Sequence, residues 1–271
     1  PGADEIDAAG CVVIPGMVNA HQHTTNSPLV RSTTPDDIAG VDSIFKWSVP
    51  LHEQVTAEDD EVSATMNAVE SLTLGVTTLI EAGTVAYPDR VAQGFTTAGI
   101  RGRVSGWGSD VMGGRFGAPL EQTLARQEEI VASLPTTGRV TGGLSLVGHG
   151  LASDELFVGM AELADKYDTF VTWHMSPGPE DARTYLARTG TRPVLHLERL
   201  GVLGPRLLLA HAVWLDDAEI EALVETRTAV ASCPAAYLRL AQGYAQAGRH
   251  LDFVRRGGRL ALGCEIGRAH V

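Results

Sequence analysis

The sequence predicts an α/β protein with a (β/α)8 TIM barrel that lacks its last helix. From Val18 onward, eight short apolar or β-branched runs alternate with seven longer stretches of helical periodicity. This is the order of a barrel of parallel strands, each followed by a helix. The 271 residues, of which 44% are hydrophobic, also suffice for one large domain with a substantial core.

Each predicted strand is a short run of mostly apolar or β-branched residues. The eight runs are Val18–His23, Val76–Ala82, Arg101–Gly106, Val140–Val147, Thr169–His174, Arg206–Val213, Thr228–Cys233 and Arg259–Cys264. The predicted helices have apolar residues at helical spacing, and several begin with a capping residue or a proline. They are Asp59–Leu74, Pro88–Ala98, Leu120–Leu134, Asp154–Lys166, Glu180–Arg188, Asp216–Glu225 and roughly Arg249–Arg256.

Charge and composition restrict the partners that we expect. The formal net charge of −12 argues against nucleic acid and anionic membrane surfaces, and no apolar run approaches the ~20 residues of a membrane span. Cys11, Cys233 and Cys264 are widely spaced in apolar runs, which is typical of buried free thiols in a reducing compartment. We therefore expect a cytoplasmic protein with a small-molecule substrate.

Histidines end several of the predicted strands. His21 and His23 end the first strand, and residues at i and i+2 lie on the same side of a strand. Two imidazoles at this spacing are typical of a chelated divalent cation, whereas a lone histidine is usually a hydrogen-bonded polar residue. His174 closes the fifth strand and His211 the sixth, so all four converge on one barrel opening. Glu265 follows the eighth strand and adds a carboxylate.

Several motifs resemble those of the amidohydrolase superfamily, and most closely those of its cytosine deaminase and triazine hydrolase-like branch. Val13–His23 is similar to the first-strand signature of that branch. Gly75–Thr78 resembles its second strand, Leu209–Val213 its sixth, and Cys233-Pro234 its seventh. The similarity runs from about Cys11 to Cys264 and implies a metal-dependent hydrolytic enzyme.

The resemblance implies a role for each residue of the constellation. His21, His23 and His174 would ligate one divalent ion, Zn²⁺ or Fe²⁺, and His211 would activate the hydrolytic water or bind the developing oxyanion. Glu265, at a position that is normally Asp, would be both the last metal ligand and the catalytic base. These roles are consistent with hydrolysis by a metal-activated water, because a metal lowers the pKa of its bound water and a carboxylate can accept the proton.

The fourth predicted strand is followed by His149 rather than by a lysine. Binuclear members of the superfamily usually need a carboxylated lysine at that position, and neither Lys46 nor Lys166 lies near a predicted strand end. A mononuclear site is therefore favoured. His149 is predicted to face the substrate, and a structural histidine is the alternative.

The segment after His174 departs from the pattern of the branch. Its deaminases usually carry a glutamate three residues after this histidine, which passes protons to the leaving nitrogen. Here that position is Pro177, which has no titratable group. Glu180 is predicted to contact the substrate if the loop folds back. The departure weakens the case for ring deamination and leaves metal-assisted hydrolysis in place.

The two ends of the chain carry their own expectations. The resemblance implies a small β-sandwich built from segments before and after the barrel, so residues 1–15 would be its remnant and residues 16–265 the barrel. Ile266–Val271 match the translation of a common sequencing adapter, whose preceding bases would complete the codon of Glu265. We therefore expect residues 266–271 to be an artefact, Asp at natural position 265, and a chain truncated at both ends.

The leading hypothesis is a metal-dependent hydrolase of non-peptide C–N or C–halogen bonds in a small heterocyclic or amide-like substrate. The first alternative is a true aminohydrolase of a purine, pyrimidine or triazine ring. The second is a metal-free relative that binds without catalysis, against which the four barrel histidines argue. We expect the full-length form to be a homo-oligomer.

Overall fold

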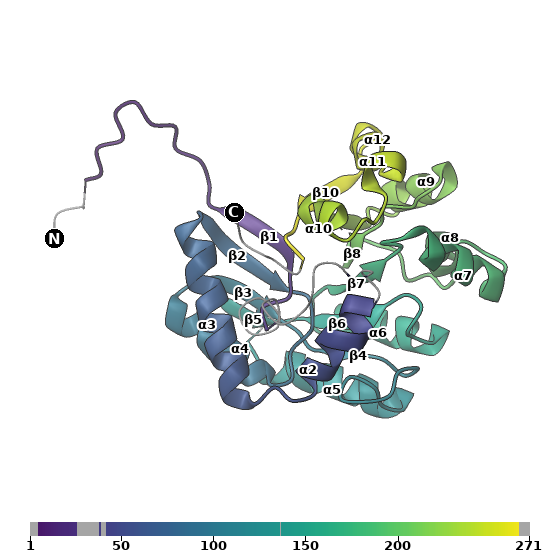
Figure 1. Cartoon of the computed structure of the whole chain (residues 1–271), viewed down its shortest axis with the longest axis horizontal. Coiled ribbons are helices and arrows are strands. Elements are labelled where there is room, and N and C mark those ends of the chain that lie inside the picture. The colour runs from purple at the N-terminus through teal and green to yellow at the C-terminus, as the bar shows by residue number, and fades with distance from the viewer. Residues whose placement is uncertain (1–4, 26–37, 39–41, 136, 266–271) are drawn as a thin grey trace.

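The computed structural model describes residues 5–25, 38, 42–135 and 137–265. Parallel strands form a wall that is surrounded by helices, and an arm at the N-terminus extends away from it (Figure 1). The adapter-like segment 266–271 and residues 26–37 and 39–41, which follow the first strand, lie outside the described residues. The fold class predicted from the sequence is confirmed.

The barrel wall consists, in the described residues, of two parallel sheets with the strand orders β1-β2-β3-β5 and β10-β9-β8-β7-β6-β4. Because β3 lies within the third predicted strand and β4 directly follows it, while β5 and β6 divide the fourth, the wall has the eight predicted positions. The strands are β1 (Met17–Gln22), β2 (Val76–Glu81), β3 (Arg101–Val104), β4 (Trp107–Gly108), β5 (Val140–Gly142), β6 (Leu144–Gly148), β7 (Val171–Met175), β8 (Leu207–His211), β9 (Ala229–Ser232) and β10 (Arg259–Leu262).

The first and last strands meet only at their carboxyl ends. Gln22 and Glu265 form an isolated parallel bridge. The amide of His23 donates to the carbonyl of Glu265 at 3.2 Å, and the amides of Cys264 and Glu265 donate to the carbonyl of His21 at 3.0 and 2.9 Å. No strand ladder joins β1 to β10 within the described part of the chain, so these bonds link the two strands only at the end where the histidines lie.

All seven predicted helices are present, with ends within two residues of the prediction. Some of these helices begin with a side-chain cap: Thr56 and Asp59 form a capping box at α3, and the Ser153 hydroxyl accepts from the Leu156 amide at α6. Short helices in the connecting segments were not predicted, because one or two turns show too little periodicity. The helices are α2 (Val49–His52), α3 (Ala57–Thr73), α4 (Pro88–Ala98), α5 (Leu120–Ser133), α6 (Asp154–Lys166), α7 (Pro179–Thr189), α8 (Pro193–Arg199), α9 (Asp217–Glu225), α10 (Pro234–Arg239), α11 (Tyr244–Ala247) and α12 (His250–Arg255), with a π-helix at Ser43–Ser48.

The largest core cluster lies between the strands and the helices of the second sheet, and it includes Trp173, Phe157 and Met160. A smaller cluster around Phe95 and Leu79 packs α3 and α4 against the first sheet. Fully burying side chains of this size contributes about 1.5–3 kcal/mol each. These clusters hold the strands whose carboxyl ends carry the candidate site.

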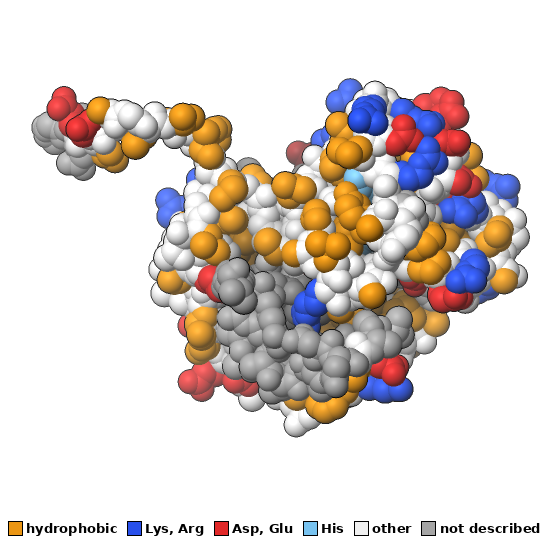
Figure 2. Space-filling view, turned by 45° about the horizontal axis from the view of Figure 1, so that its top comes forward, with side chains coloured by type: hydrophobic (Ala, Val, Ile, Leu, Met, Phe, Trp, Pro, Cys, Tyr) orange, Lys and Arg blue, Asp and Glu red, His pale blue; other side chains and the backbone are white. Residues whose placement is uncertain are grey.

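The arm at residues 5–16 has no regular secondary structure and exposes Ile6 and Val12. Figure 2 shows hydrophobic side chains along the arm and on the adjoining face of the barrel. The sandwich remnant predicted for residues 1–15 stays a prediction. The three cysteines are free, but only Cys233 is buried; Cys11 and Cys264 are exposed, because one lies in the arm and the other follows the last strand. The expectation of three buried thiols was therefore wrong. None of the described helices is both long and apolar enough to cross a membrane.

Candidate metal centre

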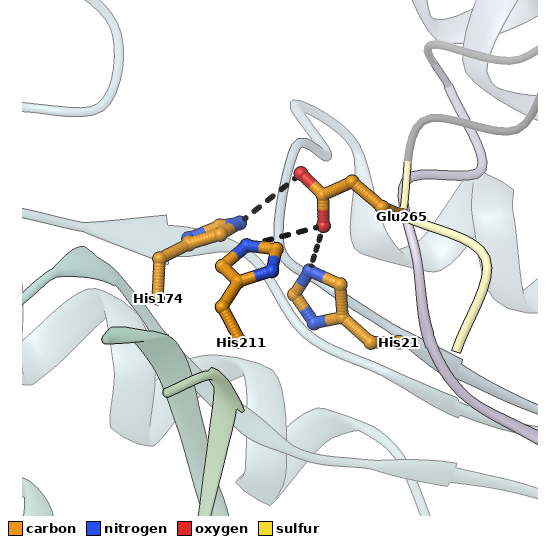
Figure 3. Close-up of side chains that lie close together, drawn as sticks. All are labelled: His21, His174, His211 and Glu265. Atoms are coloured by element: carbon orange, nitrogen blue, oxygen red, sulfur yellow. Dashed lines mark ion pairs between the residues drawn. The ribbon is translucent and has the colours of Figure 1, made fainter. Parts of the chain in front are cut away.

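The carboxyl ends of four strands bring His21, His23, His174, His211 and Glu265 together. His21 lies in β1, His174 in β7 and His211 at the end of β8, while His23 follows β1 and Glu265 follows β10. Figure 3 shows the imidazoles of His21, His174 and His211 around the Glu265 carboxylate. His21, His23, His211 and Glu265 are buried, and His174 is partly buried. The structure thus brings together the five predicted residues, while their individual roles stay a proposal.

The distances at this centre resemble those between ligands of one ion. Glu265 Oε1 lies 3.3 Å from His23 Nε2 and 3.7 Å from His174 Nε2, and Glu265 Oε2 lies 3.5 Å from His211 Nε2. His23 Nε2 and His174 Nε2 are 3.1 Å apart. Tetrahedral zinc bonds of about 2.0–2.2 Å separate neighbouring ligand atoms by roughly 3.3 Å. The pair His21 Nε2–Glu265 Oε2, at 2.5 Å, would have to separate.

Unsatisfied polar atoms at the centre also fit a bound cation. His21 Nε2 and Glu265 Oε2 have no aligned hydrogen bond with any described residue, although they face each other. A buried polar atom without a partner costs about 1–3 kcal/mol. A divalent ion between the ring nitrogens and the carboxylate would satisfy both atoms. The donor set therefore fits one divalent transition metal.

Hydrogen bonds at the second ring nitrogen, Nδ1, orient two of the imidazoles. His23 Nδ1 hydrogen-bonds to the Thr84 hydroxyl at 3.1 Å, and His174 Nδ1 donates to the carbonyl of Val147. Each bond occupies Nδ1 and leaves Nε2 directed at the centre. Partners of this kind set the tautomer and the ring orientation of a metal-ligating histidine.

Thr84→Ala is expected to raise the dissociation constant for Zn²⁺ about 10- to 100-fold, because it removes the bond that orients His23. Thr84→Ser keeps the hydroxyl and is expected to bind zinc as the parent does. Competition against a chromophoric chelator measures both variants. Equal affinities of the Ala and Ser variants would show that the Thr84 hydroxyl plays no part in metal binding.

The backbone is unusual where the strands end at the centre. Ser176, His211, Ala212 and Glu265 have positive φ angles of 41°, 76°, 49° and 61°. Non-glycine residues rarely adopt this left-handed conformation, which costs about 1–3 kcal/mol and is concentrated at functional sites. Neighbouring contacts must therefore hold these residues in place.

Burial and charge shift the titration of the same groups in opposite directions. Burial opposes ionisation of Glu265, but the facing histidines His23, His21 and His211 hold the pKa of its carboxyl well below its usual range. Burial lowers the pKa of His211 to about 4 and that of His174 well below 6.5. The centre thus combines an ionised Glu265 carboxylate with two imidazoles, His174 and His211, that resist protonation, and ligation requires a deprotonated carboxylate and neutral histidines.

The metal-free protein is expected to lose stability as the pH falls below about 6.5. Burial lowers the pKa of His52 to about 3, that of His211 to about 4, and those of His149, His174 and His250. The unfolded chain therefore binds protons below pH 6.5 that the folded chain does not. Each such histidine lowers the free energy of unfolding by about 1.4 kcal/mol for each pH unit below 6.5. Urea unfolding at pH 7.5 and 5.5 measures the difference, and equal free energies of unfolding would contradict it.

The two predicted substrate-binding residues lie in different surroundings. His149 is buried beside the centre, with Nδ1 3.2 Å from the carbonyl oxygen of His174 and its ring 5.2 Å from that of Tyr185. Its substrate-facing role stays a proposal. Glu180 lies in the first turn of α7, where its side chain is 76% exposed and pairs with Arg183. The described residues give Glu180 no contact with the centre.

Both lysines of the chain lie away from the centre. Lys46 pairs with Asp42 at the surface, and Lys166 pairs with Glu128. Neither can bridge two ions at the end of the fourth barrel strand. This placement agrees with the mononuclear site that the sequence favours.

Sequence reasoning missed an aromatic wall beside the centre. The ring of Trp107 lies 5.5 Å from that of His23 and 5.6 Å from that of His174, and Phe116 packs against it at 5.3 Å. The Trp107 indole N–H donates to the carbonyl of Ala82 at 2.6 Å, which fixes the ring. The third strand was predicted to end at Gly106, so the strand-end pattern that found the histidines excluded Trp107 by one residue.

Comparison with known proteins identifies the relatives of this chain. The Amidohydrolase family profile matches residues 12–263. The chain is 31% identical to the 5-methylthioadenosine/S-adenosylhomocysteine deaminase of Symbiobacterium thermophilum over 89% of this chain and 55% of that protein. It is 29% identical to the 5'-deoxyadenosine deaminase of Methanopyrus kandleri over 86% of this chain and 52% of that protein. The chain thus spans about half the length of these curated relatives.

Solved structures agree with the fold. The adenosine deaminase of Xanthomonas campestris with bound zinc superposes with a TM-score of 0.84 at 25% identity, covering 93% of this chain and 56% of that one. The zinc complex of the atrazine chlorohydrolase of Arthrobacter aurescens gives a TM-score of 0.81 at 22% identity, covering 93% and 59%. On its strand-end histidines, its barrel and the match over residues 12–263, the chain belongs to the amidohydrolase family.

Proposed function

We propose that the protein is a zinc-dependent aminohydrolase that releases ammonia from a purine nucleoside of the adenosine type. The observation that carries this proposal is the convergence of four barrel histidines and the Glu265 carboxylate at one barrel opening. The reaction is suggested by relatives named as deaminases of 5-methylthioadenosine, S-adenosylhomocysteine and 5'-deoxyadenosine. The metal is suggested by zinc in the related adenosine deaminase.

In this proposal, His21, His23, His174 and Glu265 hold the ion. Bound Zn²⁺ supplies a Lewis acid that brings the pKa of a water near neutrality. In this proposal Glu265 accepts the proton of the attacking water, because its carboxylate is ionised and lies at the centre beside His21 Nε2. His211, whose Nε2 lies 3.5 Å from Glu265 Oε2, binds the oxygen on which charge develops.

The remaining steps use residues around the centre. Trp107 and Phe116 provide an apolar wall against which a planar ring can pack. Pro177 occupies the position at which deaminases of the branch usually carry a proton-carrying glutamate, so in this proposal Glu265 returns the proton to the leaving amine. The predicted homo-oligomeric state and cytoplasmic location stay predictions.

Ammonia release from a substrate panel, with zinc-loaded full-length protein, tests the proposal. Adenosine, 5'-deoxyadenosine, 5-methylthioadenosine and S-adenosylhomocysteine are the expected substrates, and cytosine, guanine and a triazine serve as comparisons. Ammonia from the adenosine-type compounds alone is expected. No ammonia from any compound, with one equivalent of zinc bound, would overturn the proposal.

Hydrolysis of a C–halogen bond is the second candidate. Pro177 favours it, because chloride leaves without a proton, and a missing proton carrier would then cost little. Chloride release from a chlorotriazine, together with no ammonia from the adenosine-type compounds, would favour this candidate over deamination.

A further inference from the structure

His211 reaches the centre from a strained backbone. Its φ of 76° and the φ of 49° at Ala212 place two consecutive non-glycine residues in the left-handed region, directly where β8 ends. Such a turn persists only when its surroundings hold it. A neighbouring donor can hold this turn by hydrogen-bonding to the carbonyl groups of the two residues. Rotation of either peptide group would move the His211 imidazole away from Glu265.

His250 contacts both carbonyl groups. Its Nε2 lies 2.6 Å from the carbonyl oxygen of His211 and 3.2 Å from that of Ala212. The His250 side chain is 1% exposed, and it belongs to α12, 39 residues further along the chain than His211. A carbonyl oxygen only accepts hydrogen bonds, so Nε2 must carry the proton.

Ser232 completes the arrangement on the other side of the ring. Its hydroxyl lies 2.9 Å from His250 Nδ1, and Ser232 is the last residue of β9. With Nε2 protonated, Nδ1 accepts from the serine hydroxyl, and each ring nitrogen has a partner. Tyr237 adds a longer contact, since its hydroxyl lies 3.5 Å from the same His211 carbonyl.

We propose that His250 is a positioning residue that aims the His211 imidazole at the reacting oxygen, and that Ser232 holds the His250 ring in place through Nδ1. His250 contacts His211 and Ala212 through their backbone carbonyl groups, so its effect on the centre passes through the direction of the His211 ring. That ring is stacked on His174 at 5.3 Å and lies at the carboxylate of Glu265. The kinetic part of the test rests on the proposed function, whereas the tautomer of His250 can be measured without turnover.

Two variants separate positioning from simple core packing. The amide nitrogen of Gln reaches the position of His Nε2, so His250→Gln can still donate to the His211 carbonyl. The shorter His250→Asn places its amide near Nδ1 and cannot. We expect His250→Asn to lower kcat about 10- to 100-fold, with KM and zinc content near the parent values, and His250→Gln to stay within about threefold. Ser232→Ala, which removes the hydrogen bond to His250 Nδ1, should lie between them.

His196→Asn is the matched control, because His196 is a partly buried histidine of α8 that pairs with Asp154 and has no described contact with the five residues of the centre. Its kcat should equal that of the parent. Equal losses of kcat in His250→Gln and His250→Asn, or loss of zinc in both, would overturn the proposal. If His250→Asn does not fold, the ratio of kcat in Ser232→Ala to that in His250→Gln still decides, and a ratio of one overturns it.

Nitrogen-15 NMR of the zinc-loaded parent gives a readout without turnover. We expect His250 in the Nε2–H tautomer both in the parent and in Ser232→Ala, because the carbonyl groups of His211 and Ala212 accept only from a protonated Nε2. An Nδ1–H tautomer in the parent would overturn the positioning role whatever the activity. If the parent releases no ammonia from any compound, the proposed function fails, while the tautomer still decides the proposal about His250.

Discussion

His21→Ala is expected to abolish zinc binding and to lower kcat/KM by about 10³-fold or more, because the metal supplies several kcal/mol of transition-state stabilisation and each 1.36 kcal/mol is a factor of ten. His21 Nε2 is 2.5 Å from Glu265 Oε2, so the change removes both a ligand and the nearest partner of the carboxylate. Elemental analysis of the purified variant, together with steady-state kinetics, measures both effects.

His196→Ala is the control for this variant. It removes an imidazole of the same size whose pairing with Asp154 lies outside the centre. Zinc content and kcat/KM near those of the parent are expected. If His21→Ala retains a full equivalent of zinc, His21 does not ligate the metal, and the proposed centre is wrong.

Glu265→Gln is expected to lower kcat by about 10²- to 10⁴-fold, the contribution of a positioned general base. The amide keeps the shape of the carboxylate but cannot take the proton of the water. It also removes the negative charge that faces His23, His21 and His211. A kcat within tenfold of the parent value, at equal zinc content, would show that Glu265 is not the base.

Glu265→Asp provides the conservative comparison. One methylene less retracts the carboxylate and can relieve the 2.5 Å approach to His21 Nε2, which is shorter than the roughly 3.3 Å between ligands of a tetrahedral ion. We expect this variant to bind zinc at least as tightly as the parent and to retain kcat. A tenfold weaker affinity would instead show that the longer side chain suits the site.

The barrel and its strand-end histidines could be predicted because both depend on local pattern. Apolar runs mark buried parallel strands, and a polar residue that closes such a run must lie at the barrel opening. His21, His174 and His211 were found in this way, and the structure places each within or at the end of a strand.

The supporting residues could not be predicted, because they depend on contacts between distant segments. Thr84 reaches His23 across 61 residues, and His250 reaches His211 across 39. Both follow from the register of neighbouring elements, which no local periodicity encodes. Glu180 was named from the sequence, but it has no described contact with the centre. It remains at the surface because an acidic residue in the first turn of α7 is favourable there and pairs with Arg183 three residues on.

Anomalous X-ray diffraction at the zinc absorption edge, from crystals of the zinc-loaded full-length protein, tests the centre most directly. We predict one peak, about 2.0–2.2 Å from the Nε2 atoms of His21, His23 and His174 and from a carboxylate oxygen at position 265. A mononuclear hydrolase requires this single peak. No peak among these residues, or two peaks about 3.5–4 Å apart as in binuclear sites, would contradict the account.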